Sequence, residues 1–322
     1  MTEKTLEVYS LRINKYGDKD IYTTLSDIEG RDLFDTIFSG FPNFVDELPP
    51  DEDNKTNIQF TKKKIDSKNK TVFEKLTNKR LLYGKVSTGQ YGKVEDVIDV
   101  TDKEKEPVFQ LTHNQSVVKP FFFLFFLPQN KDTGFLVLER EGQHGIKVLF
   151  TEIIRKFVNQ QFDKHYTSFD NVIDDQLIRN YVDNGEMHSI TLTRHSLPGD
   201  IADKYGLGAH DTDKFQIELK ITAKGRSIIP TSARRRILSI MDKNPEGFFT
   251  DKSFDKIGFS EQAEIKVKSK YNRALRTIDL SNTMKFRPYY IVDVKVDASG
   301  HSNLESIKEE AVKLLGELNV QI

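Results

Sequence analysis

Apolar residues recur along this 322-residue chain in patterns typical of both strands and helices. The longest continuous run is Phe-Phe-Phe-Leu-Phe-Phe-Leu at 121–127, which lies between Pro120 and Pro128. A helix that crosses a bilayer needs about 20 mainly apolar residues, so this run is too short to span a membrane. Its length and its lack of polar alternation predict a strand that is buried on both faces. Turn-forming residues at 129–134 and β-favouring residues at 135–140 predict that this strand opens an antiparallel hairpin.

The first half of the chain mixes strand and helix patterns. The acidic, proline-containing stretch 46–53 cannot pack and predicts a loop. The expected elements are a strand at 6–13, a short helix at 32–38 that ends at Ser39-Gly40, a hairpin of strands 80–86 and 94–100 around turn glycines, and an amphipathic helix at 146–158.

The second half repeats this mixture, and the pattern loosens near 167–171, where we place a domain boundary. The expected elements are helices at 175–182, 197–206, 233–241 and 304–318, and strands at 188–193, 215–222, 263–270, 273–280 and 289–296. The sequence therefore predicts an α+β fold with two domains, 1–170 and 171–322, each a mainly antiparallel sheet with packed helices.

Composition excludes several kinds of site. The chain has no cysteine, which rules out disulfides, thiolate metal sites and cysteine nucleophiles. Its histidines are scattered, with no pair at i and i+4, so we predict neither a metal nor a cofactor. The opening Met1-Thr2-Glu3-Lys4 carries no apolar stretch of the kind that signals export, and we expect a cytoplasmic protein.

The net charge of −1 conceals an uneven distribution. Residues 219–290 contain 16 Lys and Arg against 7 Asp and Glu. A block of like charge repels itself, and folded proteins often keep one in order to attract an anion such as a nucleic-acid backbone. The alternative is that these side chains only face water.

The basic residues fall on one loop, one helix and three strands. Lys266, Lys268 and Lys270 alternate along a predicted strand and would form a line about 13–14 Å long on one face, comparable to two phosphate spacings along DNA. No recognition helix or zinc-finger spacing accompanies them, so we expect backbone contacts with little sequence preference. The predicted DNA contacts are Lys220, Lys224, Arg226, Arg234, Arg235, Arg236, Lys266, Lys268, Lys270, Arg273 and Arg276.

An enzymatic alternative uses the same strand. Glu218 and Lys220 would project from one face, as a magnesium ligand beside a water-activating lysine must in some nucleases. No aspartate on a neighbouring strand completes such a site convincingly, and Glu-x-Lys is common by chance. A third possibility is a protein-interaction module without DNA or metal.

Four segments resemble, in order and character, the RexA family of phage-exclusion proteins. These segments are Leu197-Pro198-Gly199-Asp200-Ile201, Gly206-Leu207-Gly208-Ala209, the strand at 215–222 and the basic helix at 233–241, with a looser likeness in the hairpin at 83–100. Gly142 to Gly145 and the helix behind them also look like Kiwa-type KwaB phage-defence proteins. The resemblance implies a cytoplasmic two-domain protein that dimerises, binds double-stranded DNA and acts with a membrane protein encoded nearby. We therefore expect a non-enzymatic DNA-binding protein of an abortive-infection or exclusion system.

Overall fold

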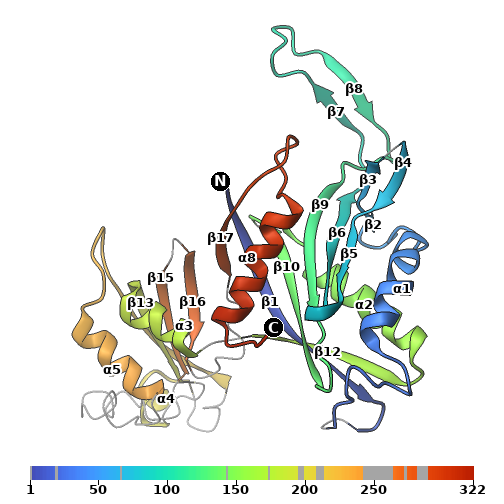
Figure 1. The fold of residues 1–322 in the computed structure, drawn as a ribbon. Helices are drawn as coiled ribbons and strands as arrows, with labels where there is room; N and C mark the ends of the chain where they lie inside the picture. Colours follow the sequence, from blue (N-terminus) through green and yellow to red (C-terminus); the bar gives the residue numbers. More distant parts are fainter. Residues whose placement is uncertain are drawn as a thin grey trace. The chain divides into compact units, whose positions relative to one another are not determined.

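The computed structural model describes residues 2–18, 21–65, 67–142, 144–172, 175–194, 199–207, 214–241, 264–271, 274–280 and 289–322 (Figure 1). The chain divides into two compact units. Unit 1 contains residues 1–172 and 289–322, and unit 2 contains residues 173–288. Both units combine helices with antiparallel sheets, in line with the predicted mixture of α and β structure.

Unit 1 is built on a nine-stranded antiparallel sheet with the main order β12-β1-β10-β9-β6-β2. Strands β11, β17 and β5 pair with β10, β1 and β6 beside this path. The strands are β1 (Thr2–Lys15), β2 (Thr56–Phe60), β5 (Phe73–Leu76), β6 (Leu81–Gln90), β9 (Lys119–Phe126), β10 (Thr133–Glu141), β11 (His144–Gly145), β12 (His165–Asn171) and β17 (Tyr290–Val294). Helices α1 (Leu33–Asp46), α2 (Lys147–Gln161) and α8 (Leu304–Glu317) accompany the sheet, and a short 3₁₀ turn occupies Thr77–Lys79.

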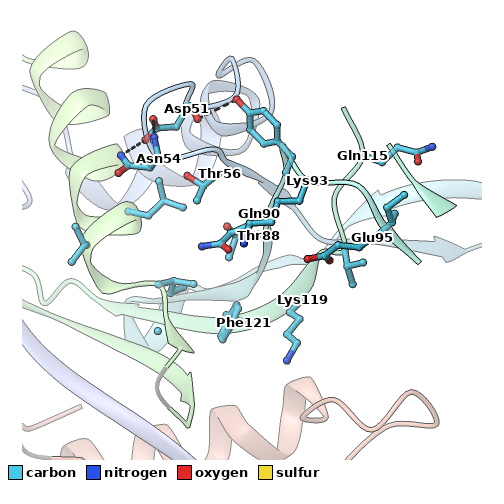
Figure 2. A pocket seen from close by; sticks show the side chains of 18 of the residues that line it. Asp51, Asn54, Thr56, Thr88, Gln90, Lys93, Glu95, Gln115, Lys119 and Phe121 are labelled. Carbon is cyan, nitrogen blue, oxygen red and sulfur yellow. Dashed lines mark hydrogen bonds between the residues drawn. The ribbon is translucent and has the colours of Figure 1, made fainter. Parts of the chain in front are cut away.

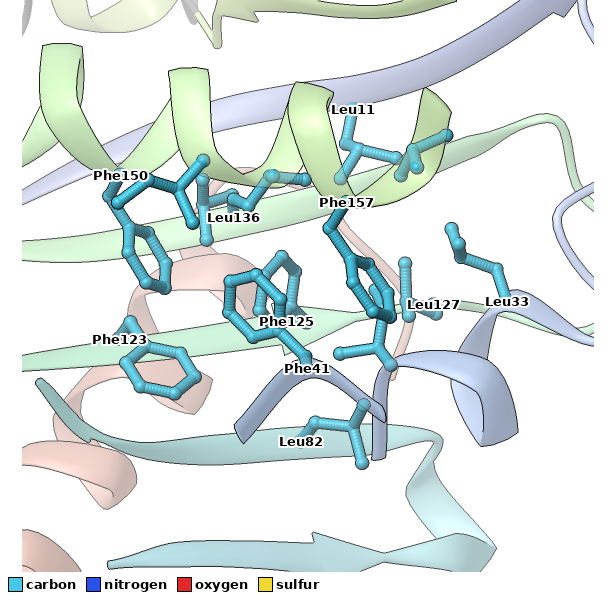
Figure 3. Close-up of a cluster of buried hydrophobic side chains, with 14 of the residues drawn as sticks. Leu11, Leu33, Phe41, Leu82, Phe123, Phe125, Leu127, Leu136, Phe150 and Phe157 are labelled. Carbon is cyan, nitrogen blue, oxygen red and sulfur yellow. The ribbon is translucent and has the colours of Figure 1, made fainter. Parts of the chain in front are cut away.

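Strand β9 lies in the middle of this sheet and is covered on both faces. Phe123 and Phe125 pack with Phe41 of α1 and Phe150 of α2, and the Phe123 and Phe150 rings lie 4.9 Å apart between centroids (Figure 3). The alternate residues Phe122, Leu124 and Phe126 pack in a second cluster with α8. The predicted two-sided burial of 121–127 and its hairpin with 135–140 are therefore confirmed.

Three predictions in the first half were wrong. The residues around Ser87 and Gly92 do not close a hairpin, because β6 pairs with β2, β5 and β9, and the next strand pairs elsewhere. Gly84 and Gly89 lie inside β6, where an added Cβ would come within 2.3 Å of a backbone carbonyl, so close approach explains these two glycines and a turn does not. Helix α1 also continues past Gly40 and through Pro42 as far as Asp46.

Two hairpins extend from unit 1. One pairs β3 (Lys62–Ile65) with β4 (Lys68–Thr71), and the other pairs β7 (Glu95–Ile98) with β8 (Pro107–Leu111). Figure 1 shows the β7–β8 hairpin projecting away from the sheet, and every residue of β7 is exposed. We refer to residues 93–111 as the arm.

The carboxy-terminal segment belongs to unit 1, which corrects the predicted second domain of 171–322. Strand β17 pairs with the beginning of β1, from Thr2 opposite Val294 to Leu6 opposite Tyr290. Ile307, Ala311 and Leu315 of α8 pack with Leu6, Leu124 and Val137 of the sheet. The sequence predicted this strand and this helix close to their observed positions, but it did not predict that they pack on the sheet of unit 1.

Unit 2 has a four-stranded antiparallel sheet with the order β14-β13-β15-β16. The strands are β13 (Glu186–Arg194), β14 (Ile217–Thr222), β15 (Glu264–Tyr271) and β16 (Ala274–Asp279). The helical segments are α3 (Asp175–Arg179), a π-helical turn at Asn180–Asn184, α4 (Gly199–Lys204) and α5 (Thr231–Met241). Ile178, Tyr181 and Ile237 from the helical segments pack on Ile190, Val267 and Ile278, so α3 and α5 cover one face of this sheet.

Candidate nucleic-acid interface

The three alternating lysines of β15 lie on one face of the unit 2 sheet. Ile265, Val267 and Ser269 are buried beneath the helices, whereas the intervening Lys266, Lys268 and Lys270 point to the opposite face. In register across β13, Lys220 of β14 and Lys266 both lie opposite Thr191. We call the surface formed by Lys220, Lys266, Lys268 and Lys270 the lysine face.

Acidic side chains neutralise part of the lysine face. The ammonium of Lys266 lies 2.9 Å from Glu264, and this hydrogen bond raises the pKa of Lys266, with additional attraction from Asp279 and Glu218. Lys270 lies 3.9 Å from Glu186, and both side chains are exposed. Since exposed pairs are weak and screened by salt, Lys270 keeps most of its attraction for another anion, whereas Lys266 sits among three carboxylates.

Two further cations lie at the end of the sheet that carries Lys268 and Lys270. The loop after β14 is held beside the start of β13, because the Ala223 amide donates to His188 and the Ile229 amide donates to Met187. Lys224 and Arg226 lie in this loop and are exposed. Lys268 and Lys270 are exposed as well, and the exposed Lys220 lies further along the same face, level with Lys266. We call the five exposed residues Lys220, Lys224, Arg226, Lys268 and Lys270 the basic end.

Three other predicted arginines, Arg234, Arg235 and Arg276, do not belong to the basic end. Arg234 is only 8% exposed, and its guanidinium donates to the carbonyls of Asp183 at 2.6 Å and Gly185 at 2.8 Å. It holds the end of the π-helical turn, so its predicted role as a DNA contact is corrected to a structural one. Arg235 is exposed on α5, which covers the face opposite the lysines.

Arg276 also lies on the covered face, opposite the fully buried Ser269. Burial raises the pKa of Tyr181, and the nearby Arg276 guanidinium opposes that rise. Arg273 and the side chain of Arg236 lie outside the described residues. The eleven predicted contacts consequently do not converge on one surface, and five of them make up the basic end.

The structure contains part of the geometry that the nuclease alternative requires. Glu218 and Lys220 lie on the same face, because they oppose Thr193 and Thr191 of β13. Within the described ranges, no group of three His, Asp or Glu side chains is placed to hold a metal ion. Glu218, Glu264 and Asp279 surround Lys266, so a cation already lies among these carboxylates.

A separate pocket of about 600 Å³ lies in unit 1 between the start of α2, the ends of β6 and β9, and the base of the arm (Figure 2). Its lining mixes uncharged polar groups such as Thr88 and Gln90 with apolar ones such as Phe121. The charged lining residues are Asp51, Lys93, Glu95, Lys119 and Glu152. The volume suits a small molecule, and the slight excess of carboxylates does not suit a polyanion.

No protein-family model matches this chain, and no curated protein is significantly similar to it. Over the part of the chain that is described, no helix is long and apolar enough to cross a membrane.

Proposed function

We propose that this protein binds double-stranded DNA without sequence preference, through phosphate contacts made by the basic end of unit 2. The observation that carries the proposal is a set of five exposed cations on β14, on the loop after it and on β15, namely Lys220, Lys224, Arg226, Lys268 and Lys270. Among the described residues, Glu186 is the one carboxylate that is paired with a member of this set. Lysines on alternate positions of a strand lie about 6.7 Å apart, so Lys268 and Lys270 can contact separate phosphates of one DNA strand.

The biological setting rests on the resemblance to RexA-type and KwaB-type proteins. We propose a cytoplasmic, non-enzymatic role in phage defence by abortive infection or exclusion, with a homodimer as the active form and a membrane protein encoded nearby as partner. No cofactor or metal is part of this proposal.

The test measures binding to two unrelated DNA duplexes by fluorescence anisotropy, over a range of salt concentrations and in the presence of EDTA. The variant Lys224→Gln/Lys268→Gln/Lys270→Gln removes three charges from the basic end. Because each phosphate contact contributes about 0.9 to the slope of log K against log salt, the slope should become shallower by about 2 to 3. The control is Lys103→Gln/Lys105→Gln/Lys131→Gln, which removes three exposed charges from unit 1 and should leave the slope unchanged.

A strong preference for one duplex, or an unchanged slope in the basic-end variant, would contradict the proposal. The nuclease alternative makes a different prediction on the same material. It requires magnesium-dependent cleavage of the duplex that is lost in Glu218→Ala, whereas backbone binding requires intact DNA to be recovered with or without magnesium.

A further inference from the structure

The β3–β4 hairpin of unit 1 is a second concentration of positive charge. Residues 62–70 contain five lysines and one aspartate. The hairpin is joined to the main sheet at its base, where the Thr61 amide donates to Lys85, the Val72 amide donates to Thr61, and the Lys85 amide donates to Val72. Its two strands pair with each other from Lys62 opposite Thr71 to Ile65 opposite Lys68.

The register distributes the lysines over both faces of the hairpin. Directly opposed residues share a face, so Lys63, Lys68 and Lys70 lie on one side, and Lys62 and Lys64 lie on the other. Lys63 stands directly opposite Lys70. Like charges in that position destabilise a strand pair, and a two-stranded hairpin has little stability of its own. A bound anion would remove this repulsion.

Few acidic groups compensate these lysines. Lys62 lies 3.0 Å from Asp46, and Lys70 lies 3.9 Å from Glu74 in an exposed pair. Lys63, Lys64 and Lys68 are exposed and have no acidic partner in the portion of the chain that the structure describes. Three lysines that have no acidic partner among the described residues thus lie within one short hairpin.

We infer that the β3–β4 hairpin is a second contact site for the phosphate backbone of duplex DNA, separate from the basic end of unit 2. The ligand follows from the proposed function, but the residues and the unit are different. A two-stranded ribbon is narrow enough to lie in the major groove, and its lysines then face phosphates on either side. An anionic membrane is the less favoured partner, because Ile65 is the only large apolar residue between Lys62 and Lys70, and membrane-surface elements need an apolar face.

The experiment compares wild type, Lys63→Gln/Lys64→Gln/Lys68→Gln, the basic-end variant and the Lys103/Lys105/Lys131 control in the same salt titration. All three hairpin substitutions are at exposed positions and Lys63→Gln removes the repulsion from Lys70, so the variant should melt no lower than wild type. We expect its dissociation constant near 0.1 M salt to rise at least about tenfold and its slope to become shallower by about 2 to 3, with the control unchanged.

The outcomes separate this inference from the proposed function. A normal slope in the hairpin variant with a reduced slope in the basic-end variant overturns only the hairpin site. The reverse pattern supports the hairpin site and overturns the basic end. Wild type that fails to bind duplex overturns both. Each protein is also sedimented with phosphatidylserine vesicles, and loss of vesicle binding in the hairpin variant with unchanged DNA binding would assign the hairpin to a membrane and overturn the inference.

Discussion

Replacing Arg234 by methionine should destabilise unit 2 without affecting DNA contacts. The side chain leaves α5 on its buried side and donates to the carbonyls of Asp183 and Gly185, and to the Thr231 hydroxyl at 3.0 Å. The two carbonyls close the π-helical turn, where a cation stabilises unsatisfied carbonyl groups. Methionine fills much of the same volume but donates nothing, so both carbonyls lose their charged donor.

The expected cost follows from these contacts. Each of the two carbonyls, which is buried at Gly185 and partly buried at Asp183, costs about 1–3 kcal/mol when it loses its donor. The Arg234 Nε is buried without a hydrogen-bond partner, and its removal returns about 1 kcal/mol. The net destabilisation is about 1–5 kcal/mol, which for a unit of this size lowers the melting temperature by on the order of 10 °C.

Differential scanning calorimetry of wild type, Arg234→Met and the exposed control Arg235→Met measures this effect. Arg235→Met should melt with wild type. Below its own transition, Arg234→Met should keep the wild-type salt slope for DNA. If Arg234→Met and Arg235→Met melted at the same temperature, the assignment of Arg234 to the carbonyls would be wrong.

Three further outcomes are expected. Asp32 caps α1 and accepts two hydrogen bonds from Arg80 at 2.7 and 2.8 Å, so Asp32→Ala should lower the unfolding free energy by about 2–4 kcal/mol in urea, against less than about 1 kcal/mol for Asp35→Ala. Replacing 95–110 of the arm by a two-residue Asn-Gly turn should leave the melting temperature of unit 1 unchanged, because no residue of that range belongs to its core; a lower temperature would show that the arm supports the sheet. Burial raises the pKa of Tyr181 above its ordinary value of 10.0, so as pH rises the unfolded chain loses this proton first and the folded state loses stability. Tyr181→Phe should therefore flatten the fall in the free energy of unfolding, measured in urea, between about pH 9 and pH 11. An equally steep fall in the variant would show that Tyr181 is not its cause.

The sequence predicted well those strands and helices whose pattern of apolar and polar residues is compatible with only one arrangement of buried and exposed faces. An apolar run between prolines, as in β9, has no polar face to expose, and the period of α2 fixes which of its sides is buried. The alternation of Lys266, Lys268 and Lys270 was confirmed for the same reason. The acids around Lys266 were not predicted, because they come from strand register, which no local pattern specifies.

Other errors arise where one residue type serves two purposes. Glycine permits both a turn and the close approach of another strand, so Gly84 and Gly89 could not be distinguished from turn residues without knowing that a carbonyl lies against each. The pairing of β17 with β1 joins opposite ends of the chain and has no local signal. Arg234 was predicted as a DNA contact and is buried, although it stands three residues before the buried Ile237 on the same side of α5. Helical periodicity is the signal that distinguishes such a position from an exposed one.

The cations of residues 62–70 produce no charge excess over a long stretch of sequence, because acidic residues before and after this short basic hairpin offset them. This local charge changes what a DNA measurement must resolve. Each lysine–phosphate contact contributes a similar amount to the salt slope wherever it lies, so the slopes lost by the basic-end and hairpin variants should add in the combined variant.

Affinity behaves differently, since a second contact made on the same duplex is intramolecular and gains an effective concentration. If one duplex reaches both sites, a long duplex should bind wild type much more tightly than a short one, and either single variant should abolish that difference. Equal length dependence in wild type and both variants would mean that the two surfaces act on separate DNA molecules.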